Sequence, residues 1–129
     1  MAGTVVTDAV KSSSANPTAF QNSGGTEVGQ LCRAWVNFNG VTTATIRASF
    51  NVSSVTRNAA GDYTVNLTNA MADANYAVAM GRSNEPSVSG GTIGVRSSTQ
   101  AAGSFRMFLA AAASSTGQDD STVYVSIFR

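Results

Sequence analysis

The chain has 129 residues, of which 12% are charged and 43% are hydrophobic. An average globular domain is roughly 25% charged, so small polar residues and alanine occupy many positions that charges usually fill. The length suits one folded domain, and the net charge of +1 comes without a basic run, which argues against nucleic-acid binding.

Residues 1–30 are rich in Ser, Asn, Pro and Gly and have little periodicity, which predicts an extended N-terminal arm. Thr4 to Val10 is compatible with one short strand, and Phe20 is expected to anchor the arm on a neighbouring surface. A disordered tail is the alternative. The segment lacks the basic and apolar regions of a signal peptide, and the chain has no run of about 18 apolar residues. We therefore expect a protein made in the cytoplasm and not inserted in a membrane.

From Leu31 onward the apolar residues alternate, which predicts strands of a β-domain over residues 31–129. The first strand places one set of side chains inward, namely Cys32, Ala34, Val36 and Phe38. Asn39-Gly40 then gives the strongest turn signal of the chain, because both residues tolerate positive φ.

The central strands follow the same period of two. Thr43 to Phe50 places Ala44, Ile46, Ala48 and Phe50 on one face. Val52 and Val55 differ in parity, so a bulge near Ser53-Ser54 is expected. Further on, Tyr63, Val65 and Leu67 share a face, the stretch from Asn69 to Asn75 is interpreted as a loop or single helical turn, and Tyr76, Val78 and Met80 resume the alternation.

The C-terminal strands are expected over Thr92 to Ser98, around Phe105, Met107 and Leu109, and over Val123, Val125 and Ile127. The alanine-rich stretch after Phe105 has helix propensity, but its period favours a strand. About eight strands at this close spacing predict an all-β fold, an antiparallel sandwich of jelly-roll-like or Ig-like type, with closure into a barrel left open.

Several strands carry apolar side chains on both faces, whereas a solitary sandwich buries one face of each sheet. Phe108, for example, lies opposite Phe105 and Leu109. We interpret the second face as a contact with other subunits. The expected interface residues are Phe20, Leu31, Trp35, Tyr124 and Phe128. Trp35 is expected to be a core or interface anchor rather than a ligand platform.

The sequence offers no recognisable catalytic cluster. With no histidine, no serine has the usual base that activates a nucleophile, so we expect neither an enzyme nor a cofactor. The lone Cys32 is expected to be a small buried residue without a disulfide. A glycosidase would need two carboxylates beside one sugar. The scattered acids Glu27, Asp62, Asp73 and Glu85 are far apart in sequence.

Two adjacent acids, Asp119 and Asp120, fall in a predicted polar hairpin loop. We interpret them as a solvated loop tip, and Ca²⁺ bound together with Gln118 is the less favoured alternative. Four arginines lie within predicted strands, where a long cation must reach solvent or find a partner: Arg33, Arg47, Arg96 and Arg106. They are expected either on an exposed face or paired with Asp62, Asp73 or carbonyls of neighbouring subunits.

The segments CRAWVNFNG, IRASFNVSSVT, GDYTVN and AMADANYAV resemble the distal domain of bacteriophage tail fibres. The resemblance covers roughly half the chain and implies a virion protein that assembles as a parallel homotrimer, a number that composition alone does not select. It also implies partners in the fibre, baseplate or capsid, and recognition of a polysaccharide or outer-membrane protein on the host cell.

Receptor contacts are expected in the loops from Arg82 to Gly91 and from Ser114 to Asp120, which mix small polar residues with isolated charges. Presented three-fold, weak contacts there would add through avidity. The residues expected at this site are Arg82, Asn84, Glu85, Ser87, Ser115, Gln118, Asp119 and Asp120.

One departure from the tail-fibre pattern lies at the N-terminus. Tail-fibre tips normally follow a long shaft, whereas here only about thirty residues precede the module. The chain is then either an excised fragment or a freestanding subunit. A freestanding subunit favours the alternative function, a capsid decoration, cement or head-fibre protein that docks on the coat through its N-terminal arm.

Overall fold

The computed structural model describes residues 3, 7, 9–10, 20–83, 91–112 and 114–129. The chain divides into two compact units, Met1–Leu31 and Cys32–Arg129. In the first unit, β1 (Phe20–Gln21) pairs antiparallel with β2 (Glu27–Gly29). The Asn22 side chain holds the connecting turn by accepting hydrogen bonds from the N–H groups of Gly24 and Thr26, both at 3.0 Å. The described part of the predicted extended arm is therefore a hairpin, and most of the expected strand from Thr4 to Val10 lies outside the described residues.

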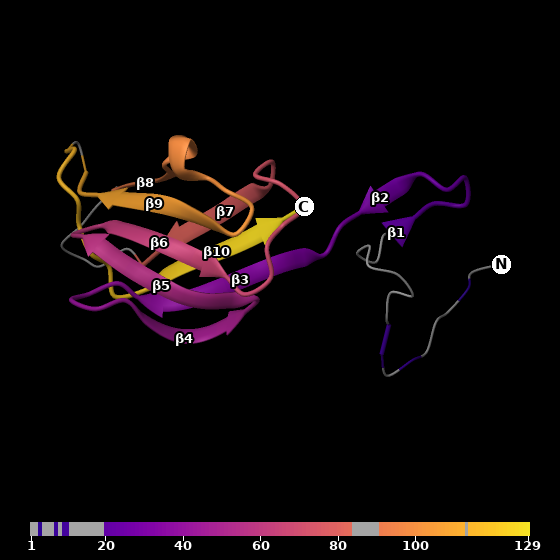
Figure 1. Ribbon diagram of the computed structural model, residues 1–129, viewed down its shortest axis with the longest axis horizontal. Helices are drawn as coiled ribbons and strands as arrows, with labels where there is room; N and C mark the ends of the chain where they lie inside the picture. The colour runs from indigo at the N-terminus through magenta and orange to yellow at the C-terminus, as the bar shows by residue number, and fades with distance from the viewer. Residues whose placement is uncertain (1–2, 4–6, 8, 11–19, 84–90, 113) are drawn as a thin grey trace. The chain divides into compact units, whose positions relative to one another are not determined.

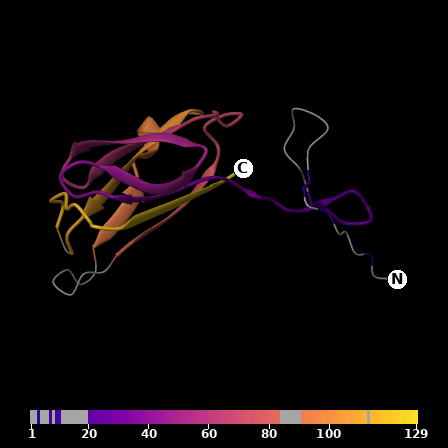
Figure 2. The same cartoon turned by 90° about the horizontal axis from the view of Figure 1, so that it is seen from below.

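The second unit consists of two antiparallel sheets of four strands each (Figures 1 and 2). The first sheet has the order β4-β3-β10-β7, and the second has the order β5-β6-β9-β8. The strands are β3 (Cys32–Asn39), β4 (Thr45–Phe50), β5 (Val52–Ala59), β6 (Asp62–Leu67), β7 (Ala77–Arg82), β8 (Thr92–Val95), β9 (Ser104–Ala110) and β10 (Val123–Phe128). The described residues contain a single 3₁₀ turn, η1 (Ser97–Thr99), and no α-helix, so the all-β prediction is confirmed.

One hydrophobic core lies between the two sheets. The inward residues of every strand contribute to it, including Val36, Val65, Met107 and Val125, and each of these has at most 2% of its surface exposed. The rings of Phe38 and Tyr63 meet edge to face with centroids 5.2 Å apart, which ties β3 of one sheet to β6 of the other. The predicted inward faces of β3, β6, β9 and β10 are confirmed, and the helical alternative for residues after Phe105 is wrong.

The register explains where the alternation succeeds and where it fails. The expected bulge is present, because the pairing of β5 with β6 shifts between Val52 and Ser54. A second shift, between Asn37 and Phe38 in the pairing with β4, was not expected. It leaves Ile46 facing the core but brings Phe50 opposite Trp35, on the outer face of the sheet. The prediction that Phe50 shares a face with Ile46 is therefore wrong.

Three local features lie outside these registers: the loop after β6, the end of β8 and the side chain of Cys32. Residues 69–75 form a loop, and the strand predicted to reach Ser98 ends at Val95, where η1 follows. Cys32 is half-buried rather than buried, and its thiol lies 3.2 Å from the carbonyl oxygen of Ala34.

Candidate functional site

The loop before β10 was expected to be a solvated tip, but Asp120 is buried within it. Arg82, at the end of β7, donates from Nε to Asp120 Oδ2 at 2.8 Å and from Nη1 to the carbonyl of Ala110 at 3.0 Å. The hydroxyl of Ser83 donates to Oδ1 of the same carboxylate. Only 11% of the Arg82 side chain and 3% of the Asp120 side chain are exposed. This ion pair joins the ends of β7 and β10, so the prediction of a solvated tip is wrong for Asp120.

Asp119 closes a second contact on the neighbouring sheet. Arg57 of β5 donates to both of its carboxylate oxygens at 2.7 to 3.0 Å. The Tyr63 hydroxyl and the Gly61 N–H donate to Oδ1 at 2.6 and 2.9 Å. Burial opposes ionisation of Asp119, but the hydrogen bonds from Arg57, Tyr63 and Gly61 outweigh it and hold the pKa of the carboxyl below its ordinary value.

The remaining predicted receptor-loop residues are placed differently from one another. Ser115 is exposed, whereas Gln118 is partly buried and its Oε1 has no hydrogen-bond partner among the described residues. Asn84, Glu85 and Ser87 lie outside the described residues. Arginines pair with the carboxylates of Asp119 and Asp120, which argues against the calcium alternative.

The outer face of the first sheet carries four exposed aromatic side chains, which we call the aromatic face: Trp35, Phe50, Tyr124 and Phe128. Trp35 of β3 lies directly opposite Phe50 of β4 and, on its other side, opposite Ser126 of β10. The exposed fractions are 39% for Trp35, 56% for Phe50, 49% for Tyr124 and 37% for Phe128. Trp35 is thus excluded from the core of its own chain. Phe20 and Leu31, in the first unit, are also exposed.

The outer face of the second sheet is polar and carries a group of charges centred on Asp62, the first residue of β6. Arg106 of β9 donates to the two Asp62 oxygens at 2.6 and 2.8 Å. Arg96 approaches the same carboxylate at 3.2 Å, and its guanidinium lies 4.6 Å from the ring centroid of Phe108. The hydrogen bond from Arg106 is the main reason that the pKa of Asp62 lies below its ordinary value. These arginines find their acid within the chain, not on a neighbour.

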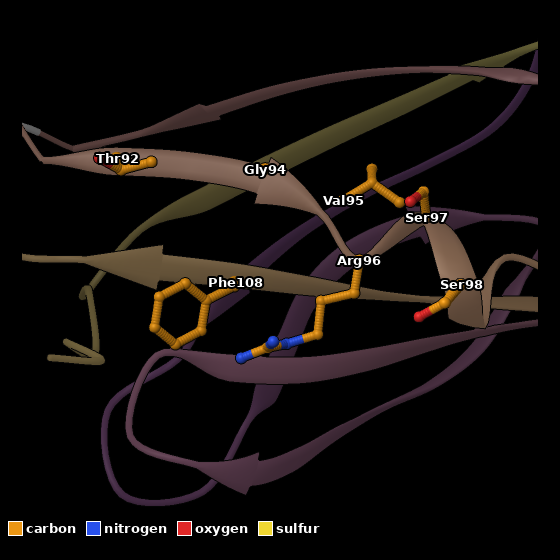
Figure 3. A pocket seen from close by; sticks show the side chains of 7 residues that line it. All are labelled: Thr92, Gly94, Val95, Arg96, Ser97, Ser98 and Phe108. Carbon is orange, nitrogen blue, oxygen red and sulfur yellow. The ribbon is translucent and has the colours of Figure 1, made fainter. Parts of the chain in front are cut away.

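Beside this cluster the surface is hollowed over a volume of about 400 Å³ (Figure 3). We call it the β8 hollow, because Thr92, Gly94 and Val95 of β8 line it together with Arg96, Ser97, Ser98 and Phe108. The alternation of the sequence placed Phe108 on the outer face, but it did not place Arg96 over its ring. The available signal was the strict parity of β9, which puts Arg106 and Phe108 on one face.

The other predicted partners are separate from this cluster. Asp73 pairs with Arg129, and Arg47 donates to the carbonyl of Ser121 at 2.7 Å. Among the residues that the structure describes, no group of three or more His, Cys, Asp or Glu side chains is arranged to hold a metal ion. The described part of the chain also has no helix long and apolar enough to cross a membrane.

Comparison of the chain with protein-family models, with curated proteins and with solved structures found no match.

Proposed function

We propose that the chain is the tip domain of a bacteriophage tail fibre, a homotrimer that binds a polysaccharide or outer-membrane protein on the host cell. The aromatic face carries this proposal. Aromatic side chains are enriched in the centres of protein interfaces. In the trimer, the aromatic faces of three copies cover one another.

The aromatic face supplies part of the apolar area that association needs. With about 200 Å² for each ring side chain and the exposed fractions of Trp35, Phe50, Tyr124 and Phe128, complete cover removes roughly 360 Å² per copy. A standard interface buries about 800 Å² per partner. The proposed contact therefore extends beyond the four rings, and the neighbouring Ala77, Ala79 and Gly81 of β7 allow a close approach.

The proposed architecture is a jelly-roll-like sandwich. Eight strands in two sheets of four match the jelly roll in number. In the Ig-like order, the first and last strands belong to different sheets, whereas β3 and β10 are neighbours here. The pairing of β3 with β10 therefore argues against the Ig-like order.

Receptor contact is proposed for the loops at the ends of the strands. Because Arg82, Asp119 and Asp120 are engaged in ion pairs that hold these loops, their side chains serve as the frame of the site. Asn84, Glu85, Ser87 and Ser115 remain the proposed contacts. Three copies of each loop would then combine weak contacts through avidity.

The mass of the protein in solution tests the assembly. Light scattering is expected to give about three times the chain mass of 13.2 kDa. The double variant Phe50→Ser/Phe128→Ser is expected to dissociate, whereas Val41→Ser, which removes a similarly exposed apolar side chain outside the aromatic face, should remain trimeric. A wild-type chain that is monomeric at micromolar concentration would remove the basis of the proposal.

Binding to cells tests the function itself. Labelled protein is expected to bind a subset of a panel of bacterial strains and to mark the tail tips of virions in immune electron microscopy. Binding to empty capsids, with labelling of the shell and none of cells, would instead establish the capsid decoration function.

A further inference from the structure

The β8 hollow combines a cation, an aromatic ring and three hydroxyl groups on one edge of the second sheet. Its lining comes from β8, η1 and β9, so the backbone beneath it is held by the ladder between β8 and β9. Gly94 is one of the lining residues, and a Cβ built there would meet no atom within 4 Å, so the space beside it is open.

The charges at the hollow do not cancel. The bidentate contact from Arg106 already neutralises Asp62. Arg96 is a second cation on the same carboxylate, and 43% of its side chain is exposed. An exposed ion pair contributes little to stability. The stability of the fold therefore does not account for the presence of this second arginine. The hollow therefore presents one uncompensated positive charge.

Two contacts orient Arg96. Its guanidinium carbon lies 4.6 Å from the ring centroid of Phe108, and its Nη2 lies 3.2 Å from Asp62 Oδ2. A guanidinium has five N–H donors in a fork that matches a carboxylate. Holding this group in place in the unbound protein reduces the entropy lost when an anion binds.

Three hydroxyl groups also line the hollow. Thr92, Ser97 and Ser98 are exposed, and in the described part of the chain their side chains make no hydrogen bond to the protein. Such hydroxyls donate to and accept from the hydroxyls of a sugar. The lining contains no open apolar surface comparable to the aromatic face, so a lipid chain or hydrophobic peptide would find little to bury.

We propose that the β8 hollow binds a carboxylated sugar of an acidic polysaccharide, with the carboxylate on Arg96 and sugar hydroxyls on Thr92, Ser97 and Ser98. The proposal deepens the receptor-binding function and rests on it. It places a receptor subsite on the face of the second sheet, away from the loops expected from the sequence. A single subsite of this kind binds with a dissociation constant on the order of 1 mM, and the trimer presents three.

Nuclear magnetic resonance titration of the full chain tests this site. The probes are oligogalacturonate, its methyl-esterified form, which has the same backbone without the charge, and oligosialate as a second carboxylated chain. At least one carboxylated probe is expected to shift the amide signals of Gly94 and Ser97, and the methyl ester is not. The variant Arg96→Gln should weaken binding at least about tenfold. Arg129→Gln, which removes the same charge at the separate pair with Asp73, should leave binding unchanged.

Several results would overturn the proposal: no shift with either carboxylated probe, equal binding of the methyl ester, equal loss in Arg96→Gln and Arg129→Gln, or shifts of equal affinity with inorganic phosphate alone. Phe108→Leu supplies an independent variant, expected to weaken binding by releasing Arg96.

Cell binding separates this inference from the function on which it rests. Attachment by wild type and Arg96→Gln alike, without a response to the probes, would reject the hollow but leave receptor binding standing. A response of the hollow to the probes without attachment to any strain would reject the function instead.

Discussion

The buried hydroxyl of Tyr63 gives the sharpest test of how the loop before β10 is held. Tyr63 is fully buried, and its hydroxyl lies 2.6 Å from Asp119 Oδ1 and 3.1 Å from the carbonyl oxygen of Gly40. Burial is the main cause of the raised pKa of Tyr63, so the phenol stays protonated and acts as a donor. Tyr63→Phe removes the donor but retains the ring and its packing against Phe38.

The expected loss follows from the partners that remain. Asp119 Oδ1 retains the N–H of Gly61 and Nε of Arg57, so one charge-assisted hydrogen bond is lost without leaving a bare carboxylate. Such a bond is worth about 1.5 to 3 kcal/mol. We therefore expect the free energy of unfolding to fall by about 2 kcal/mol, or the melting temperature by about 8 °C.

Urea unfolding at fixed protein concentration, followed by the fluorescence of Trp35, measures this difference. Ser115→Ala is the control, because this hydroxyl is exposed and lies outside the aromatic face, and its change should stay within about 0.5 kcal/mol. In an Asp119→Asn background, Tyr63→Phe should cost less, because the charged acceptor is gone. If Tyr63→Phe and Ser115→Ala have equal stability, the hydroxyl does not hold this loop and the reasoning is wrong.

Four further predictions concern the same framework and its assembly. Arg82→Ala should lower the free energy of unfolding by about 3 to 5 kcal/mol, because it leaves Asp120 buried without its cation. Arg129→Ala, which breaks a half-exposed ion pair, should cost at most about 1 kcal/mol in the same urea titration. The pKa values of Asp62 and Asp119 lie below the ordinary carboxyl value of 3.8, so the two carboxylates stabilise the folded protein at pH values above 3.8. Unfolding titrations should show that this contribution is lost as the pH falls through the lower pKa values of the folded protein. Asp119→Asn should flatten this dependence of stability on pH. Gly61→Ala should prevent accumulation of folded protein, because Gly61 has a φ of +65° and a Cβ there would lie 2.1 Å from the carbonyl oxygen of Leu109. Gly94→Ala, where a Cβ meets no atom within 4 Å, should fold with an unchanged circular dichroism spectrum. In surface plasmon resonance, the double variant Phe50→Ser/Phe128→Ser should retain the affinity of wild type for a short oligogalacturonate but lose the avidity for a long polymer. Unchanged avidity would contradict the presentation of three β8 hollows by the trimer.

The sequence predicted what depends on local alternation. The inward faces of β3 and β6 and the bulge near Ser53 follow from the period of two, because each residue in a strand faces opposite to its neighbour. The position of Phe50 was not predictable in this way. A shift in the pairing of two strands changes the face of the sheet on which a residue lies, and the alternation within either strand does not reveal that shift.

Long-range ion pairs also escaped prediction. The polar neighbours of Asp120 predict a solvated tip, but its partner Arg82 is 38 residues away and is brought close by the pairing of β7 with β10. The same is true of Asp62, which meets Arg106 across 44 residues through the pairing of β6 with β9. Low overall charge offered one clue: when acids are few, each is a candidate partner for an arginine that lies within a strand.

The two outer faces of the sandwich are unlike, and this difference links assembly to recognition. The first sheet exposes the four rings of the aromatic face, while the second exposes Arg96 and Arg106, which cover the buried carboxylate of Asp62. Because the two sheets face opposite ways across one core, a contact that covers the first leaves the second outermost. Hydrophobic burial is non-directional and suits packing against further copies, whereas an oriented guanidinium distinguishes an anionic group from a neutral one. A trimer built on Trp35 and Phe50 would thus carry its three β8 hollows outward, where a polysaccharide on a cell surface could reach more than one of them.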